Sequence, residues 1–385
     1  MSMPALFSPL TLRGLSLRNR LVLSPMCQYA AVEGVVQDWH HQHHARFAGG
    51  GIALGFVEAT GVTRNGRITH GCTGLWNDDQ IPGLHRIAEL YHAYGAASGI
   101  QLGHAGRRAS AERPWDGAAP IQRTDGPESA WERIAPSAIP ERDGYPAPRG
   151  LTEAEIEELI DGFIAATRRA HAAGFDVVEI HGAHGYLIHS FFSPISNQRN
   201  DAFGGSREKR MRFPLLVAEA MRAAWPADKP LFYRTSSVDG VPHGLTMEDT
   251  VALAQELKTR GVDVLDCSSG GMSGPATLST AKISPGYQVP YAAEVRESTG
   301  LATMAVGAII EPSQAEAILK AGKADLVAIG RQLMAEPHWL YRAGVELGHP
   351  EPDHLLATRY GFYLKRRAAV LDMPPRDTST RVSSV

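Results

Sequence analysis

Two histidines and one tyrosine directly follow an apolar segment in the middle of the chain. Segment 175–180 contains β-branched residues and is preceded by Gly174, and His181, His184 and Tyr186 come after it. Four to eight apolar residues between turn signals are typical of a buried strand. Ligands of α/β folds bind at the carboxyl ends of such strands. We therefore interpret these protonatable side chains as a candidate catalytic site, in preference to polar residues that only satisfy a loop.

The strand before these residues is one of eight that the sequence predicts. Gly174, Gly261 and Gly322 each end an amphipathic helix and precede an apolar strand, so this unit repeats. The strand candidates are 20–24, 52–58, 99–103, 175–181, 230–235, 263–267, 302–306 and 325–329. Strands that alternate with helices pair in parallel through right-handed crossovers. Eight such units close most simply into an α/β fold of the (β/α)8, or TIM barrel, type.

A doubly wound open sheet is the alternative fold. Such a sheet would need a glycine fingerprint that follows its first strand and opens a helix. The glycines at 49–51 precede a strand instead, which is the wrong context for a dinucleotide site. The barrel is therefore the preferred interpretation.

Three further features complete the expected domain. Short apolar pieces on either side of Gly14 predict an amino-terminal hairpin. Segment 108–150, after the third strand, is rich in Pro, Gly and charge, and we expect a long, partly ordered loop excursion or lid there. Thr152 and Glu155 form a capping box that opens the next helix. We expect residues 1–385 to form a single barrel domain, with 108–150 as an insertion and 350–385 as a carboxy-terminal tail.

The overall composition is that of an ordinary globular protein, with 43% hydrophobic and 21% charged residues. The net charge of −3 gives no electrostatic basis for binding nucleic acid or an anionic membrane. Cys27, Cys72 and Cys267 are too few and too far apart for a disulfide framework or a four-cysteine iron–sulfur cluster. Since neither a signal-like start nor an apolar run of membrane-spanning length is present, we expect a cytoplasmic protein.

The loops after the last two strand candidates suggest a phosphate site. Gly307 follows the seventh strand, and Gly330 and Arg331 follow the eighth. In barrels these two loops frequently bind phosphate through backbone amides and a helix amino terminus. Glycine permits close approach of the backbone, and Arg331 could add charge. The alternative, that these glycines only turn strands into helices, stays open on spacing alone.

Five short motifs occur in order along the chain, at or near predicted strand ends. They are SPMC at 24–27, QLGHAGR at 101–107, HGAHGY at 181–186, NQRNDAFGGS at 197–206 and IGR at 329–331. Together they resemble the Old Yellow Enzyme family of FMN-dependent ene-reductases over roughly residues 5–340. Tyr29 after Cys27, with the short amino terminus, resembles the bacterial, thermophilic-like branch. The resemblance implies a (β/α)8 barrel that binds FMN non-covalently, in agreement with the strand count.

The resemblance also implies which residues bind the flavin. The residues around the isoalloxazine ring would be Ser24, Pro25, Met26, Cys27, Ala59 and Gln101. Arg234 would lie beside the N1–C2=O edge of the ring, where a fixed cation stabilises the anionic reduced flavin. Gly307, Gly330 and Arg331 would hold the phosphate. NADPH is the implied hydride donor.

On the substrate side, the resemblance implies that His181 and His184 donate hydrogen bonds to a carbonyl or nitro oxygen. Hydride transfer to the β-carbon of an activated alkene builds negative charge on that oxygen, and each donor could be worth about 3 kcal/mol. Tyr186 would supply the proton, because a phenol with a reference pKa of about 10 is a neutral acid at neutral pH. Tyr29 would line the substrate pocket. The expected activity is NADPH-dependent reduction of α,β-unsaturated carbonyl or nitro compounds.

Other polar residues near the motifs have competing interpretations. Cys27 could tune the flavin potential or be a small buried hydrophobe, and both stay open. Arg107 matches the family, whereas Arg108 stands where this branch usually has Lys, so the charge is kept and the geometry is not. The resemblance implies a homo-oligomer, a dimer or tetramer, and Arg359 is a candidate for reaching the neighbouring subunit's site.

A histidine-rich stretch, 40–44, opens the first predicted helix. His40 and His44 have the i, i+4 spacing that can place two metal ligands on one helix face. No third ligand follows at a recognisable spacing, so we expect no metal and a partly exposed helix face.

Two other functions are compatible with a phosphate-binding barrel. One is a lyase without flavin, although a Schiff-base form would need a Lys near Cys267 and Ser268 at the end of the sixth strand. The other is a flavin-binding protein with a sensing role. The visible spectrum would test the lyase, and cyclohexenone-dependent anaerobic oxidation of NADPH would separate an enzyme from a sensor.

Overall fold

The computed structural model describes residues 3–273 and 283–371. Eight parallel strands form a closed barrel, in which the last strand pairs with the first. In barrel order they are β3 (Leu21–Leu23), β4 (Leu54–Gly61), β5 (Ala97–Gly103), β8 (Val177–Gly182), β9 (Leu231–Ser236), β10 (Val264–Ser268), β11 (Ala302–Val306) and β12 (Leu326–Ile329). Each overlaps its predicted range, so the (β/α)8 barrel is confirmed.

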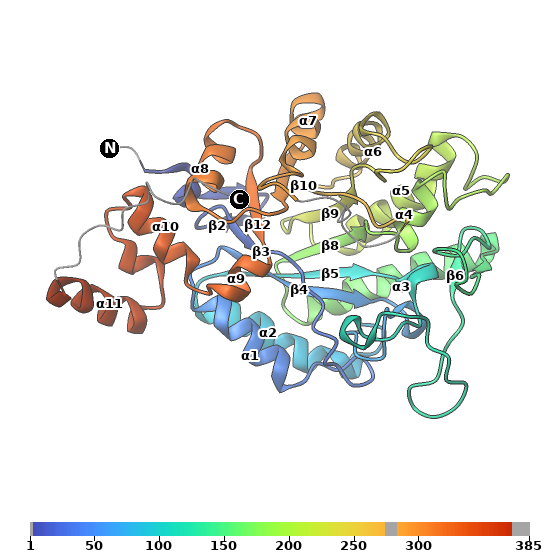
Figure 1. Ribbon diagram of the computed structural model, residues 1–385, viewed down its shortest axis with the longest axis horizontal. Helices are drawn as coiled ribbons and strands as arrows, with labels where there is room; N and C mark the ends of the chain where they lie inside the picture. The colour runs from blue at the N-terminus through green and yellow to red at the C-terminus, as the bar shows by residue number, and fades with distance from the viewer. Residues whose placement is uncertain (1–2, 274–282, 372–385) are drawn as a thin grey trace.

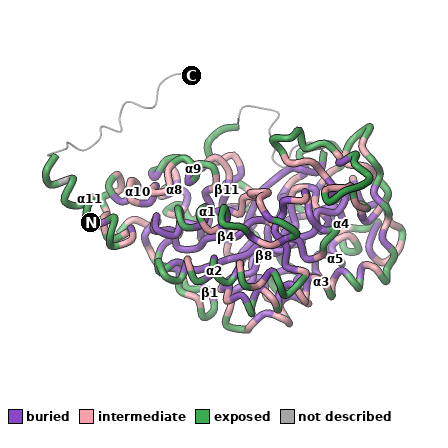
Figure 2. The backbone as a smooth tube through the Cα atoms, turned by 90° about the horizontal axis from the view of Figure 1, so that it is seen from below, coloured by how far each residue is buried: buried purple, intermediate pink, exposed green. Residues whose placement is uncertain are grey.

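Helices lie between successive strands and cover the outer face of the barrel (Figure 1). They are α1 (Asp38–Ala48), α2 (Ile81–Ala93), α3 (Glu153–Ala172), α4 (Leu187–Phe192), α5 (Arg207–Ala224), α6 (Met247–Thr259), α7 (Val289–Thr299) and α8 (Pro312–Lys320). After the last strand come α9 (Arg331–Ala335), α10 (Trp339–Leu347) and α11 (Thr358–Leu371). The larger hydrophobic core packs apolar helix faces, such as Ile156 and Phe163 of α3, with strand residues such as Val178. Figure 2 shows buried residues concentrated in the middle of the molecule, with exposed residues around them.

The predicted amino-terminal hairpin consists of β1 (Leu10–Leu12) and β2 (Leu15–Leu17), which pair antiparallel. Leu12 and Leu17 are buried in a second apolar cluster with Phe56 and other strand residues. Along the strands, residues of this cluster alternate with residues of the larger, outer core. Since successive side chains of a strand point to opposite faces, this second cluster fills the inside of the barrel. The hairpin lies against its amino-terminal end, which leaves the carboxyl ends of the strands for a ligand site.

The predicted helix starts and stops are confirmed in atomic detail. Before α3, Thr152 Oγ1 accepts a hydrogen bond from the Glu155 N–H at 3.3 Å, and the Glu155 carboxylate accepts one from the Thr152 N–H at 2.8 Å. Thr246 and Asp249 form the same reciprocal pair before α6. The three repeat glycines have φ angles of 84°, 81° and 64°. This left-handed conformation favours glycine and ends each helix directly before a strand.

Segment 108–150 leaves the barrel after β5 and is described throughout (Figure 1). It contains a short helical turn, η5 (Pro114–Asp116), and the first strand of a two-residue parallel pair, β6 (Ile134–Ala135) with β7 (Arg149–Gly150). Arg133 Nε donates to the carbonyl of Ala109 at 2.6 Å and ties the segment to its own beginning. The excursion therefore has anchored points between loops, and its role as a lid stays a prediction.

The expected tail contains helical structure. A short turn, η6 (Pro352–Leu355), leads into α11, which extends beyond α10 at one end of the molecule (Figure 1). Arg359 lies in α11 and is exposed, and residues 372–385 lie outside the described part of the chain. Within the described ranges, no helix combines the length and the apolar character needed to cross a membrane.

The prediction of a partly exposed histidine face at the start of α1 is wrong for three of its four histidines. His40, His43 and His44 are 0%, 5% and 2% exposed, whereas His41 is half-buried. His44 Nδ1 lies 2.6 Å from the hydroxyl of Tyr91, and His40 Nε2 lies 3.8 Å from a carboxylate oxygen of Glu58. Spacings of three and four residues place these rings on the helix face that packs on the barrel. Among the described residues, no group of three or more His, Cys, Asp or Glu side chains forms a metal site.

Candidate active site

A cavity of about 650 Å³ lies at the carboxyl ends of the strands. Its volume is within the roughly 300–1,000 Å³ typical of small-molecule sites. The structure brings together thirteen of the fourteen predicted site residues in its lining: Ser24, Pro25, Met26, Cys27, Ala59, Gln101, His181, His184, Tyr186, Arg234, Gly307, Gly330 and Arg331. Tyr29 is the exception. It hydrogen-bonds the Cys27 side chain and packs edge-on against Trp115 at 5.7 Å, so it lies next to the cavity without lining it.

Strand register places the polar lining residues side by side. In the β8–β9 pair His181 is opposite Arg234, and in the β9–β10 pair Arg234 is opposite Asp266. In the β5–β8 pair Gln101 is opposite Glu179. Residues opposite each other in parallel strands point to the same face of the sheet. These side chains therefore converge at the floor of the cavity, inside the barrel.

The cavity floor holds a cation among buried acids. Arg234 Nε lies 3.1 Å from Asp266 Oδ2, and Nη1 donates to Ser24 Oγ at 3.3 Å. Gln101 Nε2 donates to Glu179 Oε1 at 2.8 Å. Burial, with the nearby Asp266 charge, raises the pKa of Glu179 to about 8. Burial also raises the pKa of Asp266 to about 6, although Arg234 opposes the increase. The Arg234 guanidinium is thus held by Asp266 and Ser24, and Glu179 is held by Gln101.

The two predicted histidine donors meet at the cavity, with ring centroids 5.2 Å apart. Burial and the Arg234 charge lower the pKa of each ring well below its ordinary value, so both rings are neutral. His181 Nδ1 accepts the Ala183 N–H at 3.3 Å, which places the ring proton on Nε2. His184 Nε2 lies 2.7 Å from Ser268 Oγ. His181 therefore offers a fixed N–H, and His184 shares its Nε2 with a serine in this structure.

Tyr186 has the environment of a neutral acid. Its ring packs edge-on against His181 at 4.9 Å, and the Arg108 guanidinium carbon lies 5.8 Å from the ring centre. Burial and the neighbouring Cys27 raise the pKa of Tyr186, and the Arg108 charge only partly offsets this. The phenol is therefore protonated at neutral pH and can give a proton to a cavity-bound molecule. Burial also raises the pKa of the Cys27 thiol well above its ordinary value, so Cys27 is not a thiolate nucleophile.

The residues of the predicted phosphate site also line the cavity. Gly307 has a φ of 113°, and a Cβ there would lie 2.7 Å from Gln288 Nε2. A Cβ on Gly330 would lie 3.0 Å from the sulfur of Met26. Side chains at either position would thus intrude on the cavity, while Arg331 is exposed at its edge. A buried cation, a glycine-lined region and a second, exposed cation in the lining of one cavity fit the ring and phosphate of FMN.

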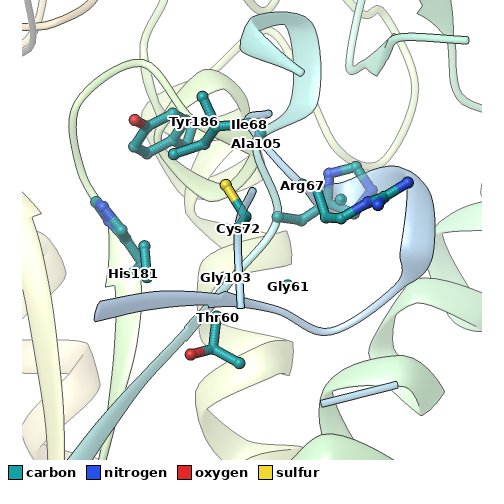
Figure 3. A pocket seen from close by; sticks show the side chains of 12 residues that line it. Thr60, Gly61, Arg67, Ile68, Cys72, Gly103, Ala105, His181 and Tyr186 are labelled. Atoms are coloured by element: carbon teal, nitrogen blue, oxygen red, sulfur yellow. The ribbon is translucent and has the colours of Figure 1, made fainter. Parts of the chain in front are cut away.

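A second, much smaller cavity, of about 10 Å³, adjoins His181 and Tyr186 (Figure 3). His181, Tyr186 and Cys72 line it. His104 also lines it, and its Nδ1 accepts the Gly106 N–H at 2.9 Å. Its Nε2 has no hydrogen-bond partner among the described residues. The space is about that of one water molecule, which would satisfy this donor.

Two lining residues, Tyr287 and Gln288, were missed from the sequence. They precede α7, and Gln288 Nε2 donates to the carbonyl of Val306 at 3.2 Å, which brings this segment over the end of β11. Gln288 Oε1 accepts from Ser269 Oγ at 2.7 Å. The available signal was a polar pair directly after Gly286 and before a helix. It was missed because these residues follow no strand closely in the sequence.

Comparison with known proteins shows that all eight barrel strands fall within the match to one protein family. Residues 5–349 match the model of the NADH:flavin oxidoreductase / NADH oxidase family. The chain is 47% identical to an NADPH dehydrogenase from Geobacillus thermodenitrificans (strain NG80-2) over 345 residues, which cover 89% of this chain and 94% of that protein.

Two solved structures are similar in fold. Morphinone reductase superposes with a TM-score of 0.73 at 27% identity, covering 90% of each chain. A 2-naphthoyl-CoA reductase, solved with 2-naphthoyl-CoA, superposes with a TM-score of 0.79 at 26% identity. That match covers 90% of this chain but 53% of the reductase, so the chain spans about half the length of that relative.

Proposed function

The chain belongs to the NADH:flavin oxidoreductase / NADH oxidase family, and we propose that it reduces activated carbon–carbon double bonds. This membership confirms the resemblance to the Old Yellow Enzyme family, with FMN as cofactor and NADPH as hydride donor. The protein is an oxidoreductase. The proposed substrates are α,β-unsaturated carbonyl and nitro compounds. Two relatives that share the barrel are named as reductases of morphinone and of 2-naphthoyl-CoA, which supports a reduction.

The lining residues divide between the cofactor and the substrate. Bound FMN supplies the hydride that reaches the alkene. The residues proposed to surround its ring are Ser24, Pro25, Met26, Cys27, Ala59, Gln101 and Arg234. Gly307, Gly330 and Arg331 are proposed to hold its phosphate. A Cβ at Gly307 or Gly330 would fill space beside Gln288 or Met26 in the cavity lining, and this supports the assignment.

His181 and His184 are proposed to bind the oxygen that activates the alkene. The His181 Nε2–H has a fixed tautomer, and the substrate oxygen takes the place of Ser268 as partner of His184 Nε2. Two neutral N–H donors in a preorganised site stabilise the negative charge that develops on this oxygen, at about 3–4 kcal/mol for each donor. Their low basicity supports the role, because neutral rings keep their geometry without competing for the transferred proton.

Tyr186 is proposed to give its hydroxyl proton to the carbon next to the activating group. Its raised pKa keeps the proton on the hydroxyl until the substrate carbon becomes basic. Tyr29 is proposed to form the wall behind Cys27 and to limit the width of the substrate pocket together with Trp115.

The single observation that carries this function is the meeting of His181, His184 and Tyr186 on one wall of a cavity whose other residues fit a flavin nucleotide. The test is anaerobic oxidation of NADPH by the FMN-loaded protein with and without 2-cyclohexenone. We expect oxidation to depend on the enone and to yield cyclohexanone. NADPH oxidation at the same rate without the enone, and no reduced product, would contradict the proposal.

The cellular setting follows from composition and relatives. We propose a cytoplasmic enzyme that acts on small molecules and has no nucleic-acid or membrane partner, supported by the net charge of −3 and by bacterial relatives. We further propose one barrel domain, with segment 108–150 as a lid over the cavity, and a homo-oligomer. The contact of Trp115, within this segment, with Tyr29 supports the lid.

A further inference from the structure

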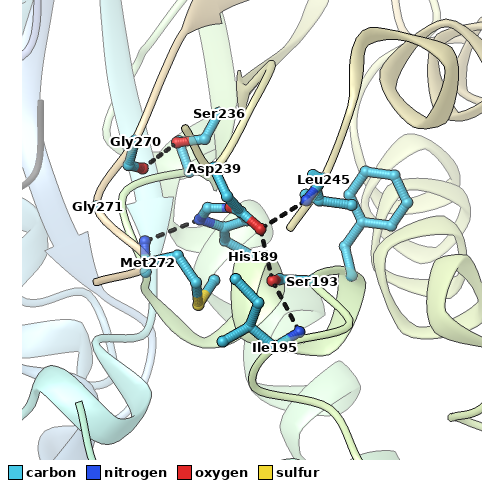
Figure 4. Close-up of polar contacts among 12 residues, drawn as sticks. His189, Ser193, Ile195, Ser236, Asp239, Leu245, Gly270, Gly271 and Met272 are labelled. Carbon is cyan, nitrogen blue, oxygen red and sulfur yellow. Dashed lines mark hydrogen bonds and ion pairs between the residues drawn. The ribbon is translucent and has the colours of Figure 1, made fainter. Parts of the chain in front are cut away.

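A buried histidine–aspartate contact that the proposed reaction does not use lies directly behind the loop that carries His184 and Tyr186. His189 Nε2 is 2.9 Å from Asp239 Oδ1, and both side chains are 0% exposed. On its other side, His189 Nδ1 accepts the backbone N–H of Gly185 at 2.9 Å. Figure 4 shows His189 between the Asp239 carboxylate and the chain that precedes α4. Gly185 is the residue between His184 and Tyr186, so the pair contacts the backbone that carries both side chains.

The carboxylate is fixed from its second oxygen as well. Asp239 Oδ2 accepts from Ser193 Oγ at 2.7 Å and from the Leu245 N–H at 2.8 Å (Figure 4). Burial acts to raise the pKa of Asp239, but His189 and these hydrogen bonds outweigh it and hold the pKa below its ordinary value. An ionised carboxylate has only acceptors, so the His189 nitrogen that faces it must carry a proton. In neutral His189 the other nitrogen, Nδ1, is then an acceptor.

The loop that His189 holds has an unusual backbone conformation. His184 has a φ of 61° and Gly185 a φ of 75°. The His184 N–H donates to Ser236 Oγ at 2.9 Å, and the His184 carbonyl accepts from Arg108 Nη1 at 3.2 Å. A left-handed conformation is unfavourable for a residue with a Cβ, so it persists only where surrounding contacts determine it. The Gly185 N–H to His189 bond is one of these contacts, next to Tyr186.

We propose that Asp239 and His189 are positioning residues, in which the carboxylate fixes the histidine tautomer and the histidine holds Gly185, and so places His184 and Tyr186 against the substrate. This inference rests on the proposed roles of His184 and Tyr186. The arrangement orients a backbone amide through a histidine, and neither side chain touches the substrate. A displacement of about 1 Å in such a site can cost about 100-fold in rate.

Replacement of Asp239 by asparagine should reverse the tautomer. Two donors, from Ser193 and Leu245, face the Oδ2 position, so the amide oxygen of Asn takes that place. The amide NH2 then faces His189 Nε2, which must become the acceptor. The ring proton then lies on Nδ1, so two N–H groups, those of Nδ1 and of Gly185, point at each other. The side-chain size is unchanged, and the hydrogen bond to the loop is lost.

Two substitutions of His189 separate its two contacts. In His189→Asn, the amide oxygen lies near the former Nδ1 position and can accept from Gly185, while the contact with Asp239 is lost. In His189→Gln, the longer amide reaches towards Asp239 and no longer presents an acceptor at the Nδ1 position. A purely structural role of the buried pair would make both variants equally defective. The positioning role requires the Asn variant to retain more activity.

The experiment combines ring ¹⁵N NMR with single-turnover kinetics on the FMN-loaded protein. The chain has 16 histidines, so the His189 signals are identified by their loss in His189→Asn. We expect a protonated Nε2 in the wild type and a protonated Nδ1 in Asp239→Asn. The rate of enone reduction by the reduced enzyme should fall about 10- to 100-fold in Asp239→Asn and His189→Gln, and less than about threefold in His189→Asn.

An unchanged His189 tautomer in Asp239→Asn, or equal rates in the two His189 variants, would overturn the inference. If Asp239→Asn does not fold, the two His189 variants still decide between the structural and the positioning roles. Tyr186→Phe is measured alongside. A normal enone rate in Tyr186→Phe, together with a reversed tautomer in Asp239→Asn, would instead contradict the proposed role of Tyr186 as the acid.

Discussion

Removing one oxygen atom from Tyr186 is the sharpest perturbation of the proposed proton transfer. Phenylalanine keeps the ring that packs against His181 at 4.9 Å and that lies 5.8 Å from the Arg108 guanidinium carbon. The shape of the cavity and the binding of FMN are therefore expected to be unchanged. What is lost is the acid, whose raised pKa keeps it protonated throughout the neutral range.

The expected magnitude follows from what general acids contribute. A positioned acid accelerates proton transfer by about 10²–10⁴-fold, which is about 2.7–5.4 kcal/mol at 1.36 kcal/mol for each factor of ten. Two ionisable lining side chains lie near Tyr186, and neither is a good replacement acid. Burial keeps His181 neutral, and burial raises the pKa of the Cys27 thiol well above its ordinary value. Water entering a cavity of about 650 Å³ can protonate the carbon more slowly. We therefore expect a loss within this range and not complete inactivity.

Stopped-flow spectroscopy measures the two half-reactions separately. In Tyr186→Phe, reduction of FMN by NADPH should stay within about threefold of the wild type, because that step requires no proton from the phenol. Reoxidation by cyclohexenone should slow by about 10²–10⁴-fold. Tyr233→Phe is the matched control, since it removes the hydroxyl of a buried tyrosine on β9 and should leave both rates unchanged. Equal losses in the two half-reactions of Tyr186→Phe would refute the role of Tyr186.

Two other predictions concern the floor and the phosphate end of the cavity. Glu179 has a pKa of about 8 when folded and 4.5 as its ordinary value, so folding takes up a proton between these pH values and stability falls as pH rises through this window. Glu179→Gln should therefore flatten the decrease in melting temperature between pH 6 and 8. Asp266, with a pKa of about 6, contributes little to the slope in this window. An unchanged slope in the variant would show that Glu179 is already ionised. Gly307→Ala should weaken FMN binding by about tenfold or more, as measured by quenching of flavin fluorescence, because its Cβ meets Gln288 and its φ of 113° is unfavourable for alanine. Gly348→Ala, at a φ of 75° in open space, tests backbone strain alone and should leave FMN affinity unchanged; equal weakening in both variants would reject the role of Gly307 in the proposed phosphate site.

The barrel and most of its site follow from local patterns in the sequence. Repeated glycines with positive φ end helices directly before apolar strands, and they located three of the eight strands. Since parallel strands of a barrel all end on one face, residues as distant as Ser24, Gln101, Arg234 and Arg331 could be assigned to one site before any contact was known. The motif order then connected these ends to a flavin family.

The parts that were missed depend on contacts between distant segments. The histidines of α1 were expected on a partly exposed helix face. Tyr91 and Glu58, from other elements, lie beside His44 and His40 and permit their burial. Gln288 reaches the cavity only because the chain before α7 turns back over β11. Asp239 lies in the loop that precedes α6, and His189 lies in α4, 50 positions earlier in the sequence. No local periodicity encodes such pairings.

The central claim is that two histidines and a tyrosine on β8 and its loop act on an activated alkene beside reduced FMN. Its most direct test is a single turnover, in which the FMN-loaded protein is reduced anaerobically with one equivalent of NADPH and mixed with 2-cyclohexenone. We expect flavin reoxidation at a rate that saturates with enone concentration, and one equivalent of cyclohexanone. A flavin that stays reduced in the presence of enone, and that oxidises only when oxygen is admitted, would contradict it.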